Sequence, residues 1–276
     1  MAAREWPFWM SPLSYWQPAH FPDTAWGGHA PFAFWLMDVL APRSVVELGT
    51  HNGFSTFVFA EAAKRLGLDT TIDAVDSWEG DEHIGFYGDE VYRAVAEIAA
   101  ADYPDTVRLR RGYFADVRPQ VPDASTDLLH IDGRHFYEDV LEDVTMWRSS
   151  VRDGGVILFH DIAVTERGFG VWRVWDELSQ QHPTFSFRHS YGLGVLAVGE
   201  VADPRLRALF DADDATADRI RADYERLGAA VTERVLLDAV PGQLAALVDS
   251  ESWRLTRPLR VVWQSLKRSR GRGQPR

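Results

Sequence analysis

Residues 44–56 read SVVELGTHNGFST, and this stretch decides the fold. Ser44 to Leu48 predicts a short buried strand, residues 49–53 a tight turn, and Phe54 onward a helix. This order directs helix N-terminal N–H groups and bare glycine backbone at whatever lies beyond the carboxyl end of the strand. The stretch therefore indicates a site for a nucleotide-like ligand.

Strands and helices are predicted to alternate after this turn. Each predicted strand is apolar enough to be buried on both faces, and each crossover is helical, which is typical of a largely parallel α/β sheet with helices on both faces. The predicted strands are 71–76, 107–110, 127–132 and 155–161, and the predicted helices are 87–101 and 136–149. Residues 185–199 differ, because two β-rich runs surround Tyr191-Gly192-Leu193-Gly194 and predict a closing antiparallel pair.

The sequence divides into four parts that differ in composition. Residues 1–30 are rich in tryptophan and proline and predict either an aromatic strap on the core or a lid over a flat substrate. Residues 31–200 form the α/β domain, and a helix opens at Pro31. Residues 201–253 predict a helical C-terminal extension, and residues 254–276 a basic amphipathic tail.

Composition narrows the class of protein. The chain has 276 residues, 46% of them hydrophobic, and no cysteine, which excludes disulfides and thiolate metal sites. No apolar run approaches the roughly 20 residues that span a bilayer, and residues 1–10 do not resemble a signal peptide, so we expect a cytoplasmic protein. Residues 1–253 carry 21 basic and 41 acidic side chains, which disfavours nucleic acid as a partner.

The spacing of polar residues selects the type of ligand. A dinucleotide site needs three close glycines around a pyrophosphate, whereas Gly49 is followed only by Gly53, and Glu47 would repel a phosphate. A nicotinamide oxidoreductase is therefore disfavoured. An acidic residue here suits a cationic nucleoside such as S-adenosylmethionine, whose ribose diol Asp76 can bind.

Four motifs occur in order along residues 23–199. They are Val46-Glu47-Leu48-Gly49 with Gly53 and Ser55, Val75-Asp76-Ser77-Trp78 with Gly80 to His83, His130-Ile131-Asp132-Gly133-Arg134-His135, and Gly154-Gly155 through His160-Asp161. With them the chain resembles the class I S-adenosylmethionine-dependent methyltransferases, and among them methyltransferase family 24. The resemblance implies a Rossmann-like seven-stranded sheet whose last strand inserts antiparallel. The residues that it implies for the cofactor are Glu47, Gly49, Thr50, Asn52, Gly53, Ser55, Asp76, Ser77 and Asp132.

A second set of residues resembles the metal-dependent sugar O-methyltransferases. The resemblance implies that Asp132 and the pair His160-Asp161 bind Mg²⁺, that Asp132, His135 and Asp161 are catalytic, and that His135 is the general base. A metal that coordinates two neighbouring sugar hydroxyls would acidify one of them. The chain departs from these enzymes at His160, where they have a carboxylate, so Mn²⁺ is an alternative. A second interpretation is that His160 is a structural histidine and Asp161 orients substrate without metal.

Further candidates concern the acceptor and the partners. His83, Tyr87, Trp26 and His29 are candidates for substrate contact, and a loop-stabilising role is an equal alternative for His83 and Tyr87. Residues 252–260 are similar to a tail of proteins of surface-polysaccharide assembly, which favours a glycan or glycoside acceptor. The tail also suits peripheral contact with the inner face of a membrane, or an oligomer contact such as that of a homodimer.

The sequence is compatible with three candidate functions. The first is O-methylation of a sugar hydroxyl in a polysaccharide, an oligosaccharide or a glycosylated natural product, with S-adenosylmethionine and a divalent metal. The second is a metal-independent O-methyltransferase for a small molecule. The third is a non-catalytic protein that docks to a glycan assembly complex through its basic tail.

Overall fold

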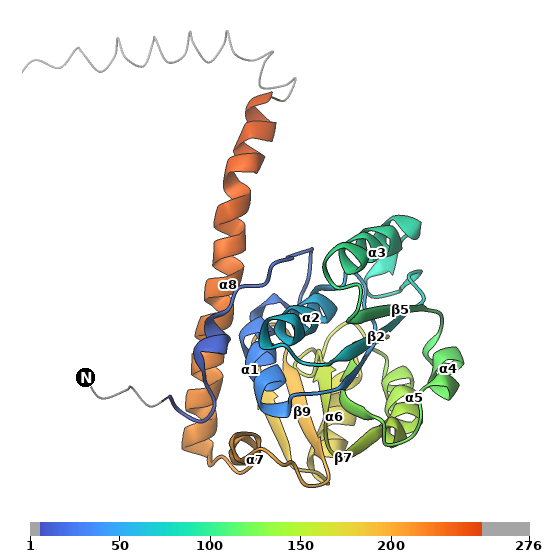
Figure 1. Ribbon diagram of the computed structural model, residues 1–276, viewed down its shortest axis with the longest axis vertical. Coiled ribbons are helices and arrows are strands. Elements are labelled where there is room, and N and C mark those ends of the chain that lie inside the picture. Colours follow the sequence, from blue (N-terminus) through green and yellow to red (C-terminus); the bar gives the residue numbers. More distant parts are fainter. Residues whose placement is uncertain (1–5, 250–276) are drawn as a thin grey trace, which may run out of the picture. The chain divides into compact units, whose positions relative to one another are not determined.

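The computed structural model describes residues 6–249, with side chains described up to residue 235 (Figure 1). The chain divides into two compact units, residues 1–231 and residues 232–276. Most of the second unit, including the basic tail 254–276 and the motif 252–260, lies outside the described residues. Within the described part, no helix is long and apolar enough to cross a membrane.

The centre of the first unit is a seven-stranded sheet in the order β5-β2-β1-β6-β7-β9-β8. The seven strands are β1 (Ser44–Leu48), β2 (Thr71–Asp76), β5 (Val107–Arg111), β6 (Thr126–Ile131), β7 (Val151–His160), β8 (Thr184–Phe187) and β9 (Leu193–Val198). Strands β5, β2, β1, β6 and β7 are parallel, whereas β9 pairs antiparallel with both β7 and β8. The predicted α/β class and the predicted antiparallel insertion are confirmed.

Helices connect the parallel strands and cover both faces of the sheet (Figure 1). They are α1 (Ala30–Leu40), α2 (Phe54–Leu66), α3 (Asp89–Asp102), α4 (Phe114–Val117), α5 (Tyr137–Trp147), α6 (Val171–Ser179), α7 (Pro204–Phe210) and α8 (Asp214–Asp249). A two-stranded hairpin, β3 (Gly80–Asp81) with β4 (Gly85–Phe86), stands apart from the main sheet. The sequence did not predict this hairpin, α4 or α6.

The side chains of each strand point alternately into two separate hydrophobic cores. Val45 and Leu128 face a core that contains side chains of α1, α2, α3, α7 and α8, whereas Val46 and Leu129 face a core that contains side chains of α4, α5 and α6. Since successive side chains of a strand point to opposite faces, this division follows from the period of two. Strands with two buried faces are rich in apolar residues, and this enrichment makes them recognisable in a sequence. Residues 44–48 and 71–76 were predicted as strands with the correct bounds.

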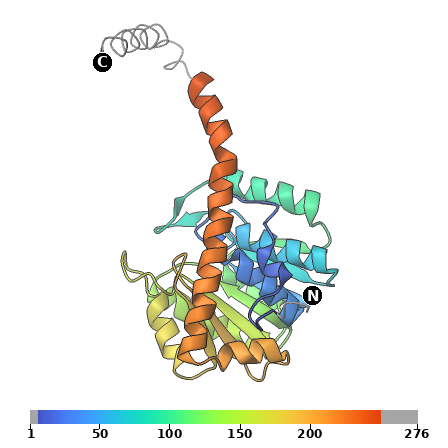
Figure 2. The same ribbon diagram turned by 90° about the vertical axis from the view of Figure 1, so that its left-hand side faces the viewer.

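The N-terminal segment packs against the first of these cores. A short 3-10 helix at Pro12–Tyr15 contacts α1 (Figure 2). The ring of Trp16 packs edge-on against that of Phe34. The first turns of α8 also join this core, because Ile220 and Tyr224 are fully buried in it. Residues 204–231 therefore share the hydrophobic core of the α/β domain.

Candidate functional site

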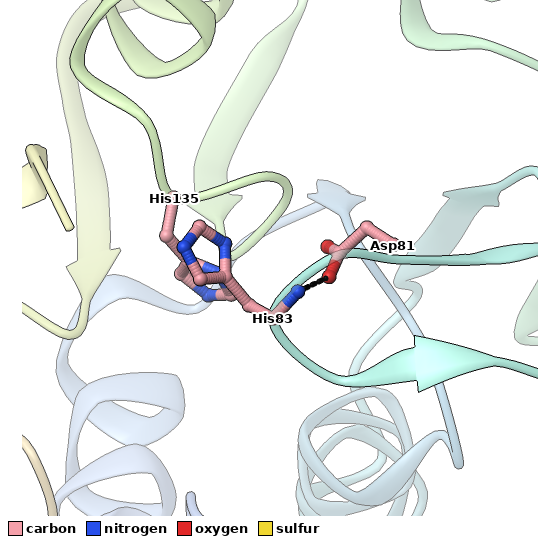
Figure 3. A group of neighbouring side chains, drawn as sticks. All are labelled: Asp81, His83 and His135. Carbon is pink, nitrogen blue, oxygen red and sulfur yellow. Dashed lines mark hydrogen bonds between the residues drawn. The ribbon is translucent and has the colours of Figure 1, made fainter. Parts of the chain in front are cut away.

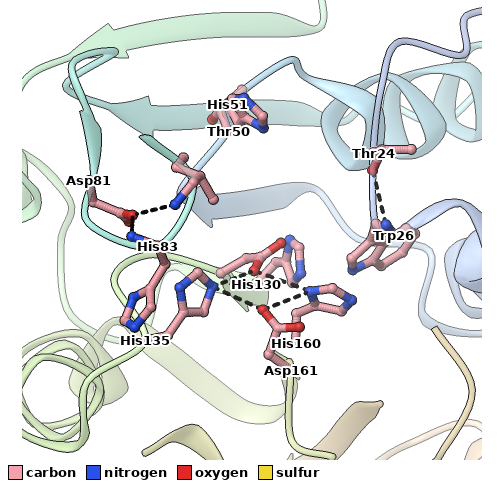
Figure 4. A network of polar contacts seen from close by, with 12 residues as sticks. Thr24, Trp26, Thr50, His51, Asp81, His83, His130, His135, His160 and Asp161 are labelled. Atoms are coloured by element: carbon pink, nitrogen blue, oxygen red, sulfur yellow. Dashed lines mark hydrogen bonds and ion pairs between the residues drawn. The ribbon is translucent and has the colours of Figure 1, made fainter. Parts of the chain in front are cut away.

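A cavity of about 880 Å³ lies at the carboxyl ends of β1, β2, β6 and β7. Its walls come from these strand ends, from residues 23–26, from the β3–β4 hairpin, and from the segments that follow β7 and β8. Figure 4 shows the side chains that gather there. This is the edge of a parallel α/β sheet where ligands bind.

The turn between β1 and α2 forms one wall of the cavity. Gly49 has a φ of +90°, and a Cβ built on it would lie 2.0 Å from the carbonyl oxygen of Asp132, so only glycine fits. The Oδ2 atom of Asp76 accepts hydrogen bonds from the backbone N–H groups of Thr50 (2.9 Å) and His51 (2.8 Å). The turn is therefore fixed to the end of β2.

Burial and hydrogen bonding act on Asp76 in opposite directions. Burial raises the pKa of its carboxyl, while backbone N–H groups of Thr50, His51 and Trp78 favour the charged form. The carboxylate is 9% exposed and lines the cavity. Thr50 also lines it, but its Oγ1 is buried and has no hydrogen-bond partner among the described residues. The carboxylate of Asp76 therefore remains able to bind a polar ligand such as a ribose.

Two carboxylates and two histidines meet on the opposite wall of the cavity. The Nε2 atom of His135 lies 2.9 Å from Oδ2 of Asp161 and 3.8 Å from Oδ1 of Asp132. The Nδ1 atom of His160 lies 3.3 Å from Oδ1 of Asp132 and 3.5 Å from Oδ2 of Asp161. Asp161 adopts a left-handed conformation with a φ of 62°, which is uncommon outside glycine and is found at functional sites.

The four groups shift one another's pKa values. Burial alone would lower the pKa of His135 and His160, but Asp132 and Asp161 raise it to about 9 and about 10. Burial would raise the pKa of the two aspartates, but the histidines hold it below the usual range for both. Two carboxylates therefore balance two imidazolium groups when the site holds only protein atoms.

The donor set also fits a divalent ion. Asp132, His135 and Asp161 each offer a ligand atom, and these atoms lie within 4.8 Å of one another. Two carboxylates suit Mg²⁺ or Mn²⁺, which prefer oxygen ligands. In this group His135 stands where the sequence predicted His160. The Nε2 atom of His160 lies 3.1 Å from the carbonyl oxygen of Ser190, so it serves as a donor and leaves only Nδ1 toward the carboxylates.

Most of the predicted site residues line this one cavity. They are Gly49, Thr50, Asn52, Ser55, Asp76, Ser77, Asp132, His135, His160, Asp161, His83, Tyr87 and Trp26. They come from six separate segments of the chain. The topology brings together the residues at the ends of β1, β2, β6 and β7, because these strands are parallel neighbours. Trp26 precedes the first strand, and His83 and Tyr87 lie in or next to the β3–β4 hairpin.

Three predicted residues do not line it. Glu47, predicted to face the cofactor, is fully buried and accepts hydrogen bonds from the hydroxyl of Thr56 and from Nδ1 of His130 (3.0 Å), because its strand position points into the core. Gly53, with a φ of +81°, does not line the cavity and is the N-cap residue of α2.

His29, predicted to contact substrate, is the third. It is fully buried, and its Nε2 lies 3.1 Å from the carbonyl oxygen of Ser190. Burial lowers the pKa of His29 well below its usual value. It therefore supports the segment around Ser190 from the core side.

Several cavity residues were missed because they lie in irregular segments. Phe169 stacks on the imidazole of His135 with ring centroids 4.5 Å apart and an interplanar angle of 18°. Arg167, Arg188 and Tyr191 also line the cavity. The segment 162–170 has no hydrophobic period, so nothing in the sequence placed it over His135. Only the fold brings these side chains to this wall.

Comparison with known proteins finds a family match for part of the chain. Residues 46–162 match the family described as a methyltransferase domain. An uncharacterized protein of Sinorhizobium fredii, y4gI, is 46% identical over 207 residues, which make up 73% of this chain and 22% of that protein. The chain thus spans less than a quarter of the length of this curated relative.

Solved structures are similar to this chain at low sequence identity. A putative caffeoyl-CoA O-methyltransferase from Staphylococcus aureus is 14% identical, with a TM-score of 0.50 over 65% of this chain and 86% of that one. The O-methyltransferase TomG from Streptomyces achromogenes, involved in tomaymycin synthesis and solved with S-adenosylmethionine, is 18% identical, with a TM-score of 0.48 over 66% of this chain and 83% of that one. Residues 46–162 thus match the methyltransferase-domain family, and the seven-stranded sheet around them has a fold like that of the Staphylococcus aureus structure.

Proposed function

We propose that this protein transfers the methyl group of S-adenosylmethionine to a hydroxyl group of a sugar, within a polysaccharide, an oligosaccharide or a glycosylated natural product. One observation carries the proposal. The turn at residues 49–55 and Asp76 line the same cavity as Asp132, His135 and Asp161, so a donor wall faces an acid–base wall.

The donor wall suits a nucleoside without a phosphate. Asp76 lines the cavity and can accept hydrogen bonds from a ribose diol. The acidic side chains of the cavity outnumber its arginines, which favours a cationic sulfonium over a phosphate ester. A cavity of about 880 Å³ has room for a methyl donor together with an acceptor.

The acid–base wall provides a proton acceptor. As the acceptor oxygen attacks the methyl carbon, the carbon–sulfur bond breaks, the sulfonium becomes a neutral thioether, and the hydroxyl proton passes to His135. His135 must be neutral for this step, although its pKa is raised to about 9 by Asp132 and Asp161. Compensation of the two carboxylates by a divalent ion would remove the cause of that shift.

Asp132 and Asp161 would hold such an ion, and the metal would supply charge to acidify the acceptor hydroxyl. The resemblance to sugar O-methyltransferases supports a sugar acceptor. The mixture of carboxylates and aromatic rings in the cavity supports it further, because sugars present both hydroxyls and apolar faces. Membrane contact or dimer formation through the tail 254–276 is proposed from the sequence alone.

A second candidate is a metal-independent O-methyltransferase for a small molecule. The balanced charges of Asp132, Asp161, His135 and His160 favour it, because His160 supplies a positive charge beside the carboxylates without an ion. In that case a phenol or another acidic hydroxyl would be the acceptor, since it needs less activation than a sugar.

A methyl-transfer screen separates the two candidates. Purified protein, labelled S-adenosylmethionine and a panel of glycans and phenols are incubated with Mg²⁺ or with excess chelator. The proposal expects label in a glycan, loss of transfer with chelator, and at least about a hundredfold loss in Asp161→Asn. Transfer to a phenol that survives chelator would favour the second candidate, and transfer to neither would contradict both.

A further inference from the structure

A second cluster of ligand atoms lies beside the acid–base wall. Asp81 and His83 come from the β3–β4 hairpin, and His135 comes from the loop after β6 (Figure 3). One ligand atom of each lies within 4.8 Å of the others. The imidazole rings of His83 and His135 are nearly perpendicular, with centroids 5.2 Å apart.

The hydrogen bond of His83 shows which of its two ring nitrogens has a free lone pair. Its Nε2 lies 3.1 Å from the carbonyl oxygen of Arg167, and a carbonyl only accepts, so Nε2 carries the hydrogen. The lone pair of the neutral ring is therefore on Nδ1. That atom is buried and has no hydrogen-bond partner among the described residues.

His135 repeats this arrangement. Its Nε2 lies 2.9 Å from Oδ2 of Asp161, which holds the ring with Nε2 as a donor. Its Nδ1 is buried without a hydrogen-bond partner in the described part of the chain, and the residue is 7% exposed. A histidine that donates its far N–H to a carboxylate or carbonyl is the usual form of a metal ligand, because the contact fixes the ring and its tautomer.

Asp81 completes a set of two imidazoles and one carboxylate. Its Oδ1 accepts hydrogen bonds from the backbone N–H groups of His83 (2.7 Å) and Ile84 (3.0 Å), which fixes the hairpin tip. We propose that Asp81, His83 and His135 form a second cation site, which takes a transition-metal ion such as Zn²⁺ or Co²⁺. Two nitrogen ligands favour these ions over Mg²⁺.

The spacing of the three residues is compatible with one ion. Ligand atoms about 2.0–2.2 Å from a tetrahedral zinc ion lie about 3.4 Å apart, and the ligand atoms of Asp81, His83 and His135 lie within 4.8 Å of one another. Coordination through Nδ1 leaves the hydrogen on Nε2, so His135 cannot accept a proton while the ion is bound. An ion at this site therefore opposes the base role of His135 and inhibits the proposed methyl transfer.

The test measures metal binding without S-adenosylmethionine, so it does not depend on methyl transfer. Co²⁺ binding is followed by its visible absorption in the wild type and in His83→Gln, Asp81→Asn and His182→Gln. The control His182 lies outside the cavity. We expect affinity to fall at least about 30-fold in the first two variants and to stay unchanged in the third. Unchanged affinity in both His83→Gln and Asp81→Asn would overturn the site.

A second measurement needs no variant. X-ray absorption at the zinc edge of the wild-type protein, loaded with one equivalent of Zn²⁺, reports the number of imidazole ligands. The site predicts two imidazoles and at least one oxygen. A spectrum with one imidazole or none would contradict the proposal.

Discussion

Asp132, His135, His160 and Asp161 form a buried group whose charges cancel when both histidines are protonated. A carboxylate in place of His160 would leave this group with a net negative charge. A divalent ion must therefore compete with protons for this site, and metal affinity is tied to pH.

The rate of methyl transfer should depend on pH through His135. Its pKa is raised to about 9, so it is protonated below that pH, and at pH 7 only about 1% of it is the neutral base. At a low Mg²⁺ concentration, we expect kcat to rise about tenfold per pH unit from pH 7 and to level off near pH 9. A higher Mg²⁺ concentration should move this rise to lower pH. A profile that is flat between pH 7 and 9 at low Mg²⁺ would rule out His135 as the base.

Asp143 should make stability fall with pH. It is 9% exposed on α5, and burial, with the charges of Asp139 and Glu142, raises its pKa to about 7. The folded state thus binds a proton that the unfolded state releases near pH 4, so stability declines as pH rises from about 4 to 7. We expect Asp143→Asn to stabilise the protein by on the order of 1–4 kcal/mol at pH 8 and little at pH 4. Thermal melts of both proteins at the two pH values check this, and equal gains at both would contradict it.

At the scale of single elements, the β1–α2 turn depends on Gly49. A Cβ there meets the backbone of Asp132 on the neighbouring strand, so Gly49→Ala should cost roughly 2–4 kcal/mol and weaken donor binding. Gly67 is the matched control, because it also has a positive φ but no atom within 4 Å of the Cβ that an alanine would add. Gly67→Ala should cost about 1 kcal/mol and leave binding unchanged. Equal losses in both variants, measured by urea unfolding, would show that only backbone strain matters.

Elements with a simple period could be predicted, and irregular ones could not. Residues 44–48 and 71–76 form mostly buried strands, and their bounds were correct. The hairpin at 80–86 has strands of only two residues, too short for any period, and α6 follows a loop without a clear start signal. The missed residues of the cavity, such as Phe169, come from these irregular parts.

Side-chain direction explains the errors within the site. Glu47 was expected to face the ligand because it precedes Gly49, but its strand position turns it toward His130 on β6. The sequence shows that both residues are polar, whereas only the strand register shows that they pair. By contrast, Asp132 and Asp161 directly follow the ends of neighbouring parallel strands, so their meeting could be predicted.

At the scale of the whole domain, the N-terminal segment and α8 are joined through Tyr224. Its hydroxyl donates to the carbonyl oxygen of Trp9, and the residue is fully buried. We expect Tyr224→Phe to cost about 1–2 kcal/mol, because that carbonyl loses its partner, and to speed hydrogen exchange in residues 8–16. The exposed Tyr15 is the control, and Tyr15→Phe should change neither property. Unchanged exchange in Tyr224→Phe would show that the contact does not hold the segment.

The combination of a donor wall and an acid–base wall in one cavity is the central claim, and calorimetric titration with S-adenosylmethionine tests it most directly. It predicts saturable binding of one molecule per chain, weakened at least about tenfold in Asp76→Ala, since that variant removes the predicted ribose contact. A titration of folded protein that shows no binding would contradict the account and would favour a non-catalytic interaction protein.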